Sequence, residues 1–287
     1  MAIRIYENEK GVFCDEESGR VTLAARSIRL PRFEKLPNAE LLRMLHHEVL
    51  INIVNGKPLP NLWVYTKPWY RDGAMMMMVL EKTGNTHLLK HWVMNLRDPF
   101  DENNGGDKEP DNLGQALYLI ACVSNASHPL VTAVLQILPS LQQDTHLNGH
   151  TDGGYHSVYQ TKWLKLGLKR LKIKDEFEIP SVADSYSSLF WTDYREHHVA
   201  HGRFDDATGE LYPYLNWAEA HFYNDKAPMA VDVRQYPQSW EAQASQADYS
   251  KMAVLSREFV DLRLAAPHSW HAAEMFLYYL DRMPRRA

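Results

Sequence analysis

The sequence predicts a mainly α protein, an (α/α)6 toroid of two concentric helix rings with a small N-terminal β appendage. A unit recurs about six times along the chain: a loop marked by Pro or Gly, rich in aromatic and charged residues, precedes an apolar helix. These helices are apolar on nearly every face, so they must be covered on all sides and would form an inner ring. Segments with one polar face lie between several of them and would form an outer ring.

Residues 1–35 are predicted to form the β appendage. The segments 3–6 and 20–23 have the composition of strands, and they flank a turn-rich segment at residues 15–19. The rest of the chain, residues 36–287, is assigned to the toroid as a catalytic domain.

Helix begins to dominate at Asn38. Apolar residues then recur at steps of three and four positions, at Leu42, Leu45, Val49 and Ile53. The dipeptide Asn55-Gly56 is expected to end this helix, because both residues are typical of the position just after a helix.

The loops of the recurring unit are spaced by roughly 30 to 55 residues. Proline fits the first turn of a helix, where its missing N–H costs nothing, so these loops should lie at helix N-termini. They occupy residues 67–72, 109–112, 151–156, 180–186, 212–217 and 266–271.

Two features make the predicted toroid irregular. Residues 199–213 contain a β-hairpin turn signal at 205–209. The chain is also short for twelve helices, so some outer helices must be stubs or missing. The segment 87–97, which has a polar face, is assigned to the outer ring.

Composition excludes several classes of function. The 31 Lys and Arg residues are outnumbered by 36 Asp and Glu residues, which argues against a nucleic-acid partner because such proteins need a basic surface. The longest apolar run, residues 74–80, is far shorter than the roughly 20 residues of a membrane-spanning helix, so no membrane partner is expected. The first ten residues lack the apolar segment of a secretory signal, and Cys14 and Cys122 are lone thiols, so we expect a cytoplasmic protein.

No cofactor and no metal are expected. The dinucleotide motif GxGxxG, the phosphate-binding GxxxxGK[ST] and the serine-hydrolase GxSxG are all missing. His197 and His201 have the spacing of two ligands on one helix face, but no HExxH motif accompanies them. Residues 101–109 loosely resemble a calcium loop, with Asn112 where the bidentate Glu belongs, so a calcium ion there is left open.

The loops at the inner-helix starts combine acids with aromatic rings. Sugar rings pack on aromatic side chains, and their hydroxyls bind carboxylates and Arg by charge-assisted hydrogen bonds. Cleavage of a glycosidic bond needs two carboxyl groups, one protonated and one ionised. If the loops share one mouth, a small saccharide would be bound by Trp69, Tyr70, Arg71, Asp72, Glu109, Asp111, Asp152, Tyr155, His156, Tyr214, Trp217, Glu219, His268 and Trp270.

Two of these motifs resemble those of a known clan. The segment Trp69-Tyr-Arg-Asp-Gly-Ala74 resembles the W-x-R-D-[GS]-A element of the six-hairpin glycosidases, the glucoamylase and glucodextranase-like clan. The segment 269–277 resembles the W-x-x-A-E helix that closes their barrel. The resemblance implies a glycoside hydrolase over about residues 36–287, in which Arg71 and Asp72 bind hydroxyls of the sugar at the cleavage site.

The resemblance also places the general acid on the loop that enters the third inner helix, which makes Asp152 the first candidate. Glu219 and Asp111 are alternatives for the base, because each lies next to an aromatic cluster at an expected inner-helix start. Each acid also has a structural interpretation: Asp72, Glu109 and Asp111 as residues of a helix start, and Asp152 as a turn residue.

Two other functions stay open. A sugar epimerase or polysaccharide lyase on the same fold would use Tyr155, His156 or His268 as its base. A helical array that has lost catalysis would only bind a partner protein or a sugar. The anomeric outcome and the oligomeric state do not follow from the sequence.

Overall fold

The fold is mainly α with a few small antiparallel sheets, as the sequence predicts. We describe it from a computed structural model of the 287-residue chain. The described residues are 4–8, 10–16, 19–24, 28–36, 39–65, 67–182, 240–241, 248–254, 256–261 and 266–281. They contain no helix with the length and apolarity needed to span a bilayer. The toroidal arrangement of the helices stays a prediction.

The chain divides into two units, each described here by itself. The first unit is discontinuous and consists of residues 1–93 and 239–287, whereas the second is the continuous segment 94–238. The sequence-based boundary at residue 35 stays a prediction.

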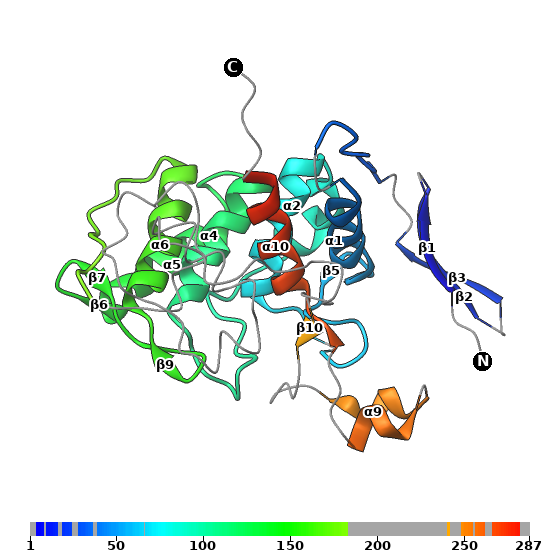
Figure 1. The fold of residues 1–287 in the computed structure, drawn as a ribbon. Helices are drawn as coiled ribbons and strands as arrows, with labels where there is room; N and C mark the ends of the chain where they lie inside the picture. Colours follow the sequence, from blue (N-terminus) through cyan, green and yellow to red (C-terminus); the bar gives the residue numbers. More distant parts are fainter. Residues whose placement is uncertain are drawn as a thin grey trace, which may run out of the picture. The chain divides into compact units, whose positions relative to one another are not determined.

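The first unit holds the N-terminal strands and the helices at both ends of the chain (Figure 1). Its first segment forms β1 (Arg4–Asn8), β2 (Gly11–Glu16), β3 (Gly19–Ala24), α1 (Ala39–Ile51), β4 (Ile53–Val54), β5 (Lys57–Pro58), α2 (Tyr70–Thr83), the 3-10 helix η1 (Thr86–Leu88) and α3 (Lys90–Met94). Its second segment forms β10 (Trp240–Glu241), the 3-10 helix η4 (Tyr249–Val254), α9 (Arg257–Asp261), β11 (Ala266–Pro267) and α10 (Ser269–Asp281).

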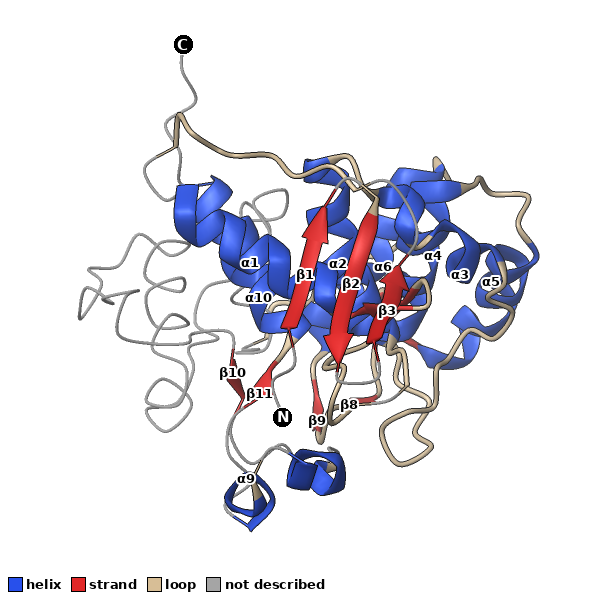
Figure 2. Ribbon diagram, turned by 90° about the vertical axis from the view of Figure 1, so that its right-hand side faces the viewer, coloured by secondary structure: helices blue, strands red, loops and turns tan. Residues whose placement is uncertain are grey.

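The N-terminal strands form an antiparallel sheet in the order β1-β2-β3 (Figure 2). Strands β1 and β3 confirm the two expected strands, but the expected turn at 15–19 is wrong in its first half. Asp15 belongs to β2, which alternates buried Val12 and Cys14 with more exposed residues and so has the period of a strand. Across the β2–β3 pair, Arg20 Nε donates to Asp15 Oδ1 at 2.8 Å, an exposed ion pair.

Helix α1 is shorter than the periodicity suggests. It ends at Ile51, and Asn55-Gly56 is the turn of the β4–β5 hairpin rather than a helix stop. Both turn residues have positive φ, 53° at Asn55 and 73° at Gly56, which matches the type I′ turn that Asn-Gly favours in two-residue hairpins. Ile53, the last residue of the helical pattern, is buried in β4 instead.

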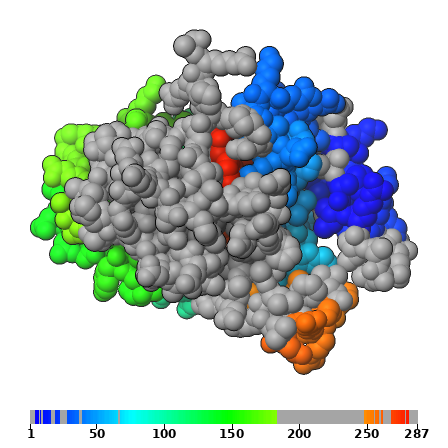
Figure 3. Space-filling view, viewed as in Figure 1, coloured from blue at the N-terminus to red at the C-terminus, as the bar shows by residue number. Residues whose placement is uncertain are grey.

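Helix α10 packs against α1 and α2, so the first and last described helices lie together (Figure 1). Part of α10 (red) lies beside blue atoms from the start of the chain in the space-filling view (Figure 3). The run Met75–Met78 on α2 is buried in the core, where the flexible methionine side chain fills irregular gaps. Burial of α2 on nearly all faces agrees with the prediction of a helix covered on all sides.

The second unit is built on helices and two short hairpins. Its described elements are α4 (Asp111–Val123), α5 (Pro129–Leu141), β6 (Gln142–Gln143), β7 (His146–Leu147), β8 (His150–Thr151), β9 (Gly154–Tyr155) and α6 (Ser157–Leu171). Helices α4 and α6 cross through glycines: a Cβ at Gly114 would lie 2.2 Å from the carbonyl carbon of Trp163, and one at Gly167 would lie 2.6 Å from Leu117 Cβ. The two backbones can approach this closely only because both positions lack a side chain.

Four expected helix starts are confirmed. Helices α2, α4, α6 and α10 begin at residues 70, 111, 157 and 269, each within or directly after a loop of the recurring unit. Other predicted features lie outside the described residues. They are the later part of the 180–186 loop, the 212–217 loop, the 199–213 segment, His197 and His201.

The expected outer helix at 87–97 is wrong in its extent. That segment forms only the end of η1 and the five-residue α3. The early end agrees with Pro99, which cannot continue a helix, and Arg97 Nη1 donates to the carbonyl oxygens of Met94 and Leu96 there.

Candidate functional site

In the first unit, residues far apart in the sequence meet where α2 and α10 begin. We call this group the α2–α10 cluster, and it consists of Tyr65, Trp69, Arg71, Asp72, His268, Ser269 and Trp270. A proline lies just before each helix start, Pro68 before α2 and Pro267 before α10, and each helix buries its apolar body below the start.

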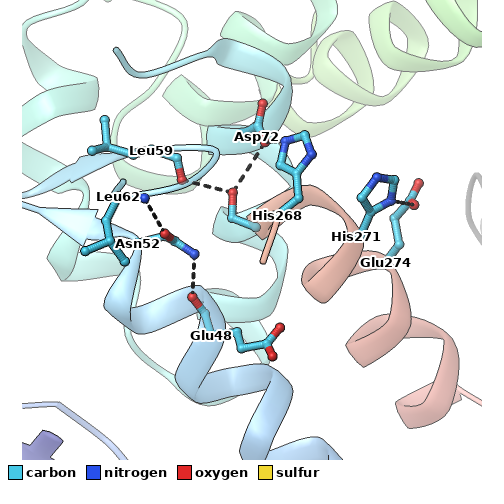
Figure 4. A network of polar contacts seen from close by, with 9 residues as sticks. Glu48, Asn52, Leu59, Leu62, Asp72, His268, His271 and Glu274 are labelled. Atoms are coloured by element: carbon cyan, nitrogen blue, oxygen red, sulfur yellow. Dashed lines mark hydrogen bonds and ion pairs between the residues drawn. The ribbon is translucent and has the colours of Figure 1, made fainter. Parts of the chain in front are cut away.

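Asp72 is the centre of the cluster (Figure 4). It is only 2% exposed and lies in the first turn of α2, where the helix dipole favours a negative charge. Its Oδ1 accepts a hydrogen bond from His268 Nε2 at 2.9 Å and lies 3.3 Å from Ser269 Oγ. Asp72 and His268 are 196 positions apart, so this carboxylate links two distant parts of the chain.

Aromatic rings surround the histidine of this pair. Tyr65 stacks on His268 with ring centroids 5.4 Å apart and an angle of 22°, and Trp69 lies edge-on to Tyr65 at 6.0 Å. The guanidinium of Arg71 lies 5.8 Å from the centre of the Trp270 ring, within cation–π distance. The cluster thus combines a buried carboxylate, a buried guanidinium and half-buried rings, the mixture that recognises sugar hydroxyls and C–H faces.

A second pair of buried ionisable groups lies one turn further along α10 (Figure 4). His271 Nδ1 lies 3.9 Å from Glu274 Oε2, an ion-pair distance that is too long for a hydrogen bond. The His271 ring is stacked on Trp270 at 5.3 Å and lies edge-on to His268 at 5.1 Å. This pair therefore extends the cluster down the helix.

Tyr70 is not part of the cluster. It is buried and lies edge-on to Trp92 of α3 with centroids 6.2 Å apart. A core role explains this contact better than the expected contact with substrate.

The second unit has its own buried polar network at the start of α4. Asp111 is fully buried, with Oδ2 accepting from Gln115 Nε2 at 2.7 Å and Oδ1 accepting from Thr151 Oγ1 at 3.1 Å. Thr151 Oγ1 in turn accepts from Gln160 Nε2 of α6 at 2.9 Å. The Asp111 carboxylate thus cross-links α4, the β8–β9 hairpin and α6, and both of its oxygens are used.

Glu109 holds two loops at the same place. Its Oε1 accepts from the backbone N–H of Asp152 at 2.5 Å and from Asn104 Nδ2 at 3.2 Å. Because Glu109 is buried, these bonds fix the 101–109 loop and the tip of the β8–β9 hairpin against the start of α4.

Asp152, Tyr155 and His156 belong to that hairpin or follow it directly. Asp152 and Gly153 have φ of 46° and 85°, so they form a type I′ turn, and the Asp152 side chain is exposed. Tyr155 is 69% exposed and lies edge-on to His150, while His156 precedes α6 and is half-buried. The hairpin offers accessible groups, whereas the acids beneath it are buried.

The sequence-based candidates therefore fall into separate groups. Within the first unit the structure brings together Trp69, Arg71, Asp72, His268 and Trp270, and within the second it brings together Glu109, Asp111 and Asp152. Tyr214, Trp217 and Glu219 lie outside the described residues. The single mouth shared by all of them stays a prediction.

Several polar residues of both groups are not predicted from the sequence. The acids are contacted directly by Ser269 in the first unit and by Gln115 and Thr151 in the second. Tyr65 stacks on His268, and Gln160 donates to Thr151. One sequence pattern could have predicted such residues: a polar residue within a helix that is otherwise apolar on all faces. Gln115, four positions after Asp111, is an example.

Among the described residues, no group of three or more His, Cys, Asp or Glu side chains could hold a metal ion. In the calcium-like loop, Asp101 Oδ1 accepts from the backbone N–H of Asn103, and Glu109 is bonded as above. These bonds are those of a loop stabilised by its own side chains.

Outside the cluster, burial strongly perturbs one histidine of the first unit. Burial in α1, with a smaller contribution from His47, lowers the pKa of His46 to about 3. Its Nε2 lies 3.4 Å from Asn85 Nδ2, a distance that suits a neutral ring accepting from the amide. His46 is therefore neutral across the physiological pH range.

No protein-family model, no curated protein and no solved structure matches this chain.

Proposed function

We propose that this protein is a glycoside hydrolase that acts on a small saccharide or glycoside. The observation that carries the proposal is the α2–α10 cluster: Asp72 and Arg71 are buried at a helix start beside the rings of Tyr65, Trp69 and Trp270. A buried charge is costly unless it has partners, so charged groups kept at such a place favour a binding role over a purely structural one.

In this proposal the α2–α10 cluster binds the sugar. Carboxylate and guanidinium groups take the hydroxyls through charge-assisted hydrogen bonds, and the indole rings take the C–H faces. This assignment agrees with the sugar-binding role that the WYRDGA resemblance implies for Arg71 and Asp72.

In this proposal the general acid and the general base are two carboxyl groups of the chain. Asp152 remains the first candidate acid because the resemblance implies an acid on this loop, and its side chain is accessible to a ligand at a hairpin tip that Glu109 holds in place. Asp111 supports the base role less well, since both of its oxygens already accept hydrogen bonds inside the second unit. Glu219 is thereby favoured as the base candidate.

The proposal is tested in two steps. A thermal-shift screen with monosaccharides, disaccharides, uronic acids and imino-sugars comes first, because a ligand at about 100 times its Kd stabilises a fold by roughly 2.7 kcal/mol. Nitrophenyl glycosides of the sugars that shift the Tm are then assayed for hydrolysis. A cooperatively melting protein that responds to no sugar and hydrolyses no glycoside would contradict the proposal.

Asp152→Asn should lower turnover about 10²-fold or more if Asp152 is the general acid. Asp144→Asn is the matched control, because Asp144 is also exposed, also has positive φ, 51° against 46° for Asp152, and also lies in a two-residue hairpin turn of the second unit. If the two variants turn over substrate at equal rates, Asp152 is not the general acid. That result would not contradict saccharide binding by the α2–α10 cluster.

A specific contact also favours a second function. His268 donates to the Asp72 carboxylate through Nε2, and a histidine paired with a carboxylate in this way can act as a general base through its other ring nitrogen. A sugar epimerase or a polysaccharide lyase would use His268 in this way. Product analysis separates the three reactions, because hydrolysis adds water, a lyase leaves an unsaturated sugar and an epimerase conserves mass.

A further inference from the structure

We infer that His268 is a positioning residue for Asp72, which it holds so that Oδ2 of the carboxylate is left for the ligand. This inference rests on the proposed function, because it concerns how the α2–α10 cluster recognises a sugar.

The two donors to Asp72 are not equivalent. Ser269 has a single hydroxyl proton, and its Oγ lies 3.0 Å from the carbonyl oxygen of Leu59 but 3.3 Å from Asp72 Oδ1. The backbone N–H of Ser269 also donates to Pro60 O at 2.8 Å, so Ser269 mainly fixes the start of α10. His268 is therefore the main hydrogen-bond donor to the carboxylate, at 2.9 Å.

The imidazole of His268 is held in one orientation. An ionised carboxylate can only accept, so Nε2 must carry the proton that points at Oδ1. Tyr65 stacks on one side of the ring at 5.4 Å, and Trp270 and His271 lie edge-on to it at 6.3 and 5.1 Å. A ring packed in this way cannot turn to follow the carboxylate, so the carboxylate is held by the ring.

The consequence for the ligand lies on the other oxygen. Both side-chain hydrogen bonds that Asp72 makes within the described part of the chain end on Oδ1. Oδ2, which can only accept, is thereby directed to a group that donates, such as a sugar hydroxyl or the ammonium of an imino-sugar. Loss of the His268 donor should let the carboxylate rotate and should weaken that bond.

The test is the binding of 1-deoxynojirimycin and its manno and galacto isomers, measured by calorimetry on the full chain. His268→Phe keeps a ring that can stack on Tyr65 but loses the donor, and it should weaken binding about tenfold or more. His268→Gln carries an amide donor at a similar reach and should restore most of the affinity. His46→Met, at another buried histidine of the first unit, is the control and should bind as the unchanged protein does.

A double-mutant cycle separates positioning from a general loss of structure. If His268 acts only through Asp72, the variant with both Asp72→Asn and His268→Phe should bind no more weakly than Asp72→Asn alone. Additive losses would overturn the positioning role. If His268→Phe does not melt cooperatively, His268→Asn replaces it, since its shorter amide should fail where Gln succeeds, and equal affinities of these two variants would overturn the inference.

The outcomes distinguish this inference from the proposed function. Imino-sugar binding that His268→Phe leaves unchanged would overturn the positioning role alone. A folded, unchanged protein that binds none of the three isomers and no sugar of the thermal-shift screen would overturn both.

Discussion

The polar groups at the start of α2 and those at the start of α4 are both buried, but they differ in composition and in reach. The α2–α10 cluster joins charged groups and aromatic rings from positions 196 apart, and its central carboxylate keeps one oxygen out of the hydrogen bonds described. The network around Asp111 joins amides and hydroxyls, the two direct donors to the carboxylate lie 4 and 40 positions away, and both carboxylate oxygens accept. The difference indicates that the first group is suited to bind a ligand and the second to hold helices together.

The largest expected effect breaks the second unit at its helix crossing. Gly114→Val places a side chain where a Cβ alone would lie 2.2 Å from backbone atoms of Trp163. Backbone cannot move aside as a flexible side chain can, so we expect a loss of at least about 3 kcal/mol in the free energy of unfolding. Urea denaturation followed by circular dichroism measures it.

The control for this prediction is Gly105→Asn. Gly105 has φ of 68° and no atom within 4 Å of an added Cβ, and Asn tolerates that backbone conformation. Its stability should change by less than about 1 kcal/mol. A Gly114→Val protein as stable as the control would mean that α4 and α6 do not cross as described.

The next largest effect contrasts the two buried carboxylates directly. Asp111→Ala leaves the Gln115 amide and the Thr151 hydroxyl without their acceptor, so we expect a loss of about 3 kcal/mol in stability. Asp72→Asn keeps the shape of the side chain and should cost less than about 1.5 kcal/mol, yet abolish most sugar binding. Chemical denaturation and calorimetry on both variants decide the comparison, and a reversed order would contradict it.

The smallest effect concerns acid pH and the first unit. His46 stays neutral in the folded protein because its pKa is lowered to about 3, whereas an unfolded chain protonates histidine at about 6.5. Below pH 6.5 the unfolded chain binds a proton that the folded protein does not, so stability falls as pH falls and continues to fall until about pH 3. Between pH 6.5 and 5.5 this loss amounts to about 1 kcal/mol.

His46→Met removes this titration and fills similar space. The Asn85 amide keeps other acceptors, Arg29 O at 2.9 Å and Thr83 Oγ1 at 3.1 Å, so the substitution leaves no unsatisfied donor. Urea midpoints measured at the two pH values should therefore differ less in His46→Met than in the unchanged protein. Identical pH dependence in both would show that His46 is not protonated on unfolding as described.

The sequence predicted the helix starts better than the helix ends. A loop marked by Pro or Gly before an apolar helix is a local pattern, and it predicts the starts at residues 70, 111, 157 and 269. The end of α1 was missed because Ile53 continues the helical spacing, although it is buried in a strand. Local periodicity cannot distinguish these two ways of burying one side chain.

The acids of the candidate site could be predicted from sequence, but their partners could not. Asp72, Glu109, Asp111 and Asp152 stand out because charge is rare beside such apolar helices. Their partners depend on tertiary packing. Asp72 meets His268 across 196 positions, and Glu109 binds the backbone N–H of Asp152 in a hairpin turn. These contacts also decide which acid is accessible and which is occupied.

The discontinuity of the first unit has a consequence for biosynthesis. Helices α1 and α2 are synthesised before residues 94–238, and α10 is synthesised only after them. At roughly 5 to 20 residues per second, the 196 positions between Asp72 and His268 correspond to a delay of about 10 to 40 s. During this delay α1 and α2 expose the apolar faces that α10 later covers, so the yield of native protein should depend on translation speed and on chaperones that shield nascent chains.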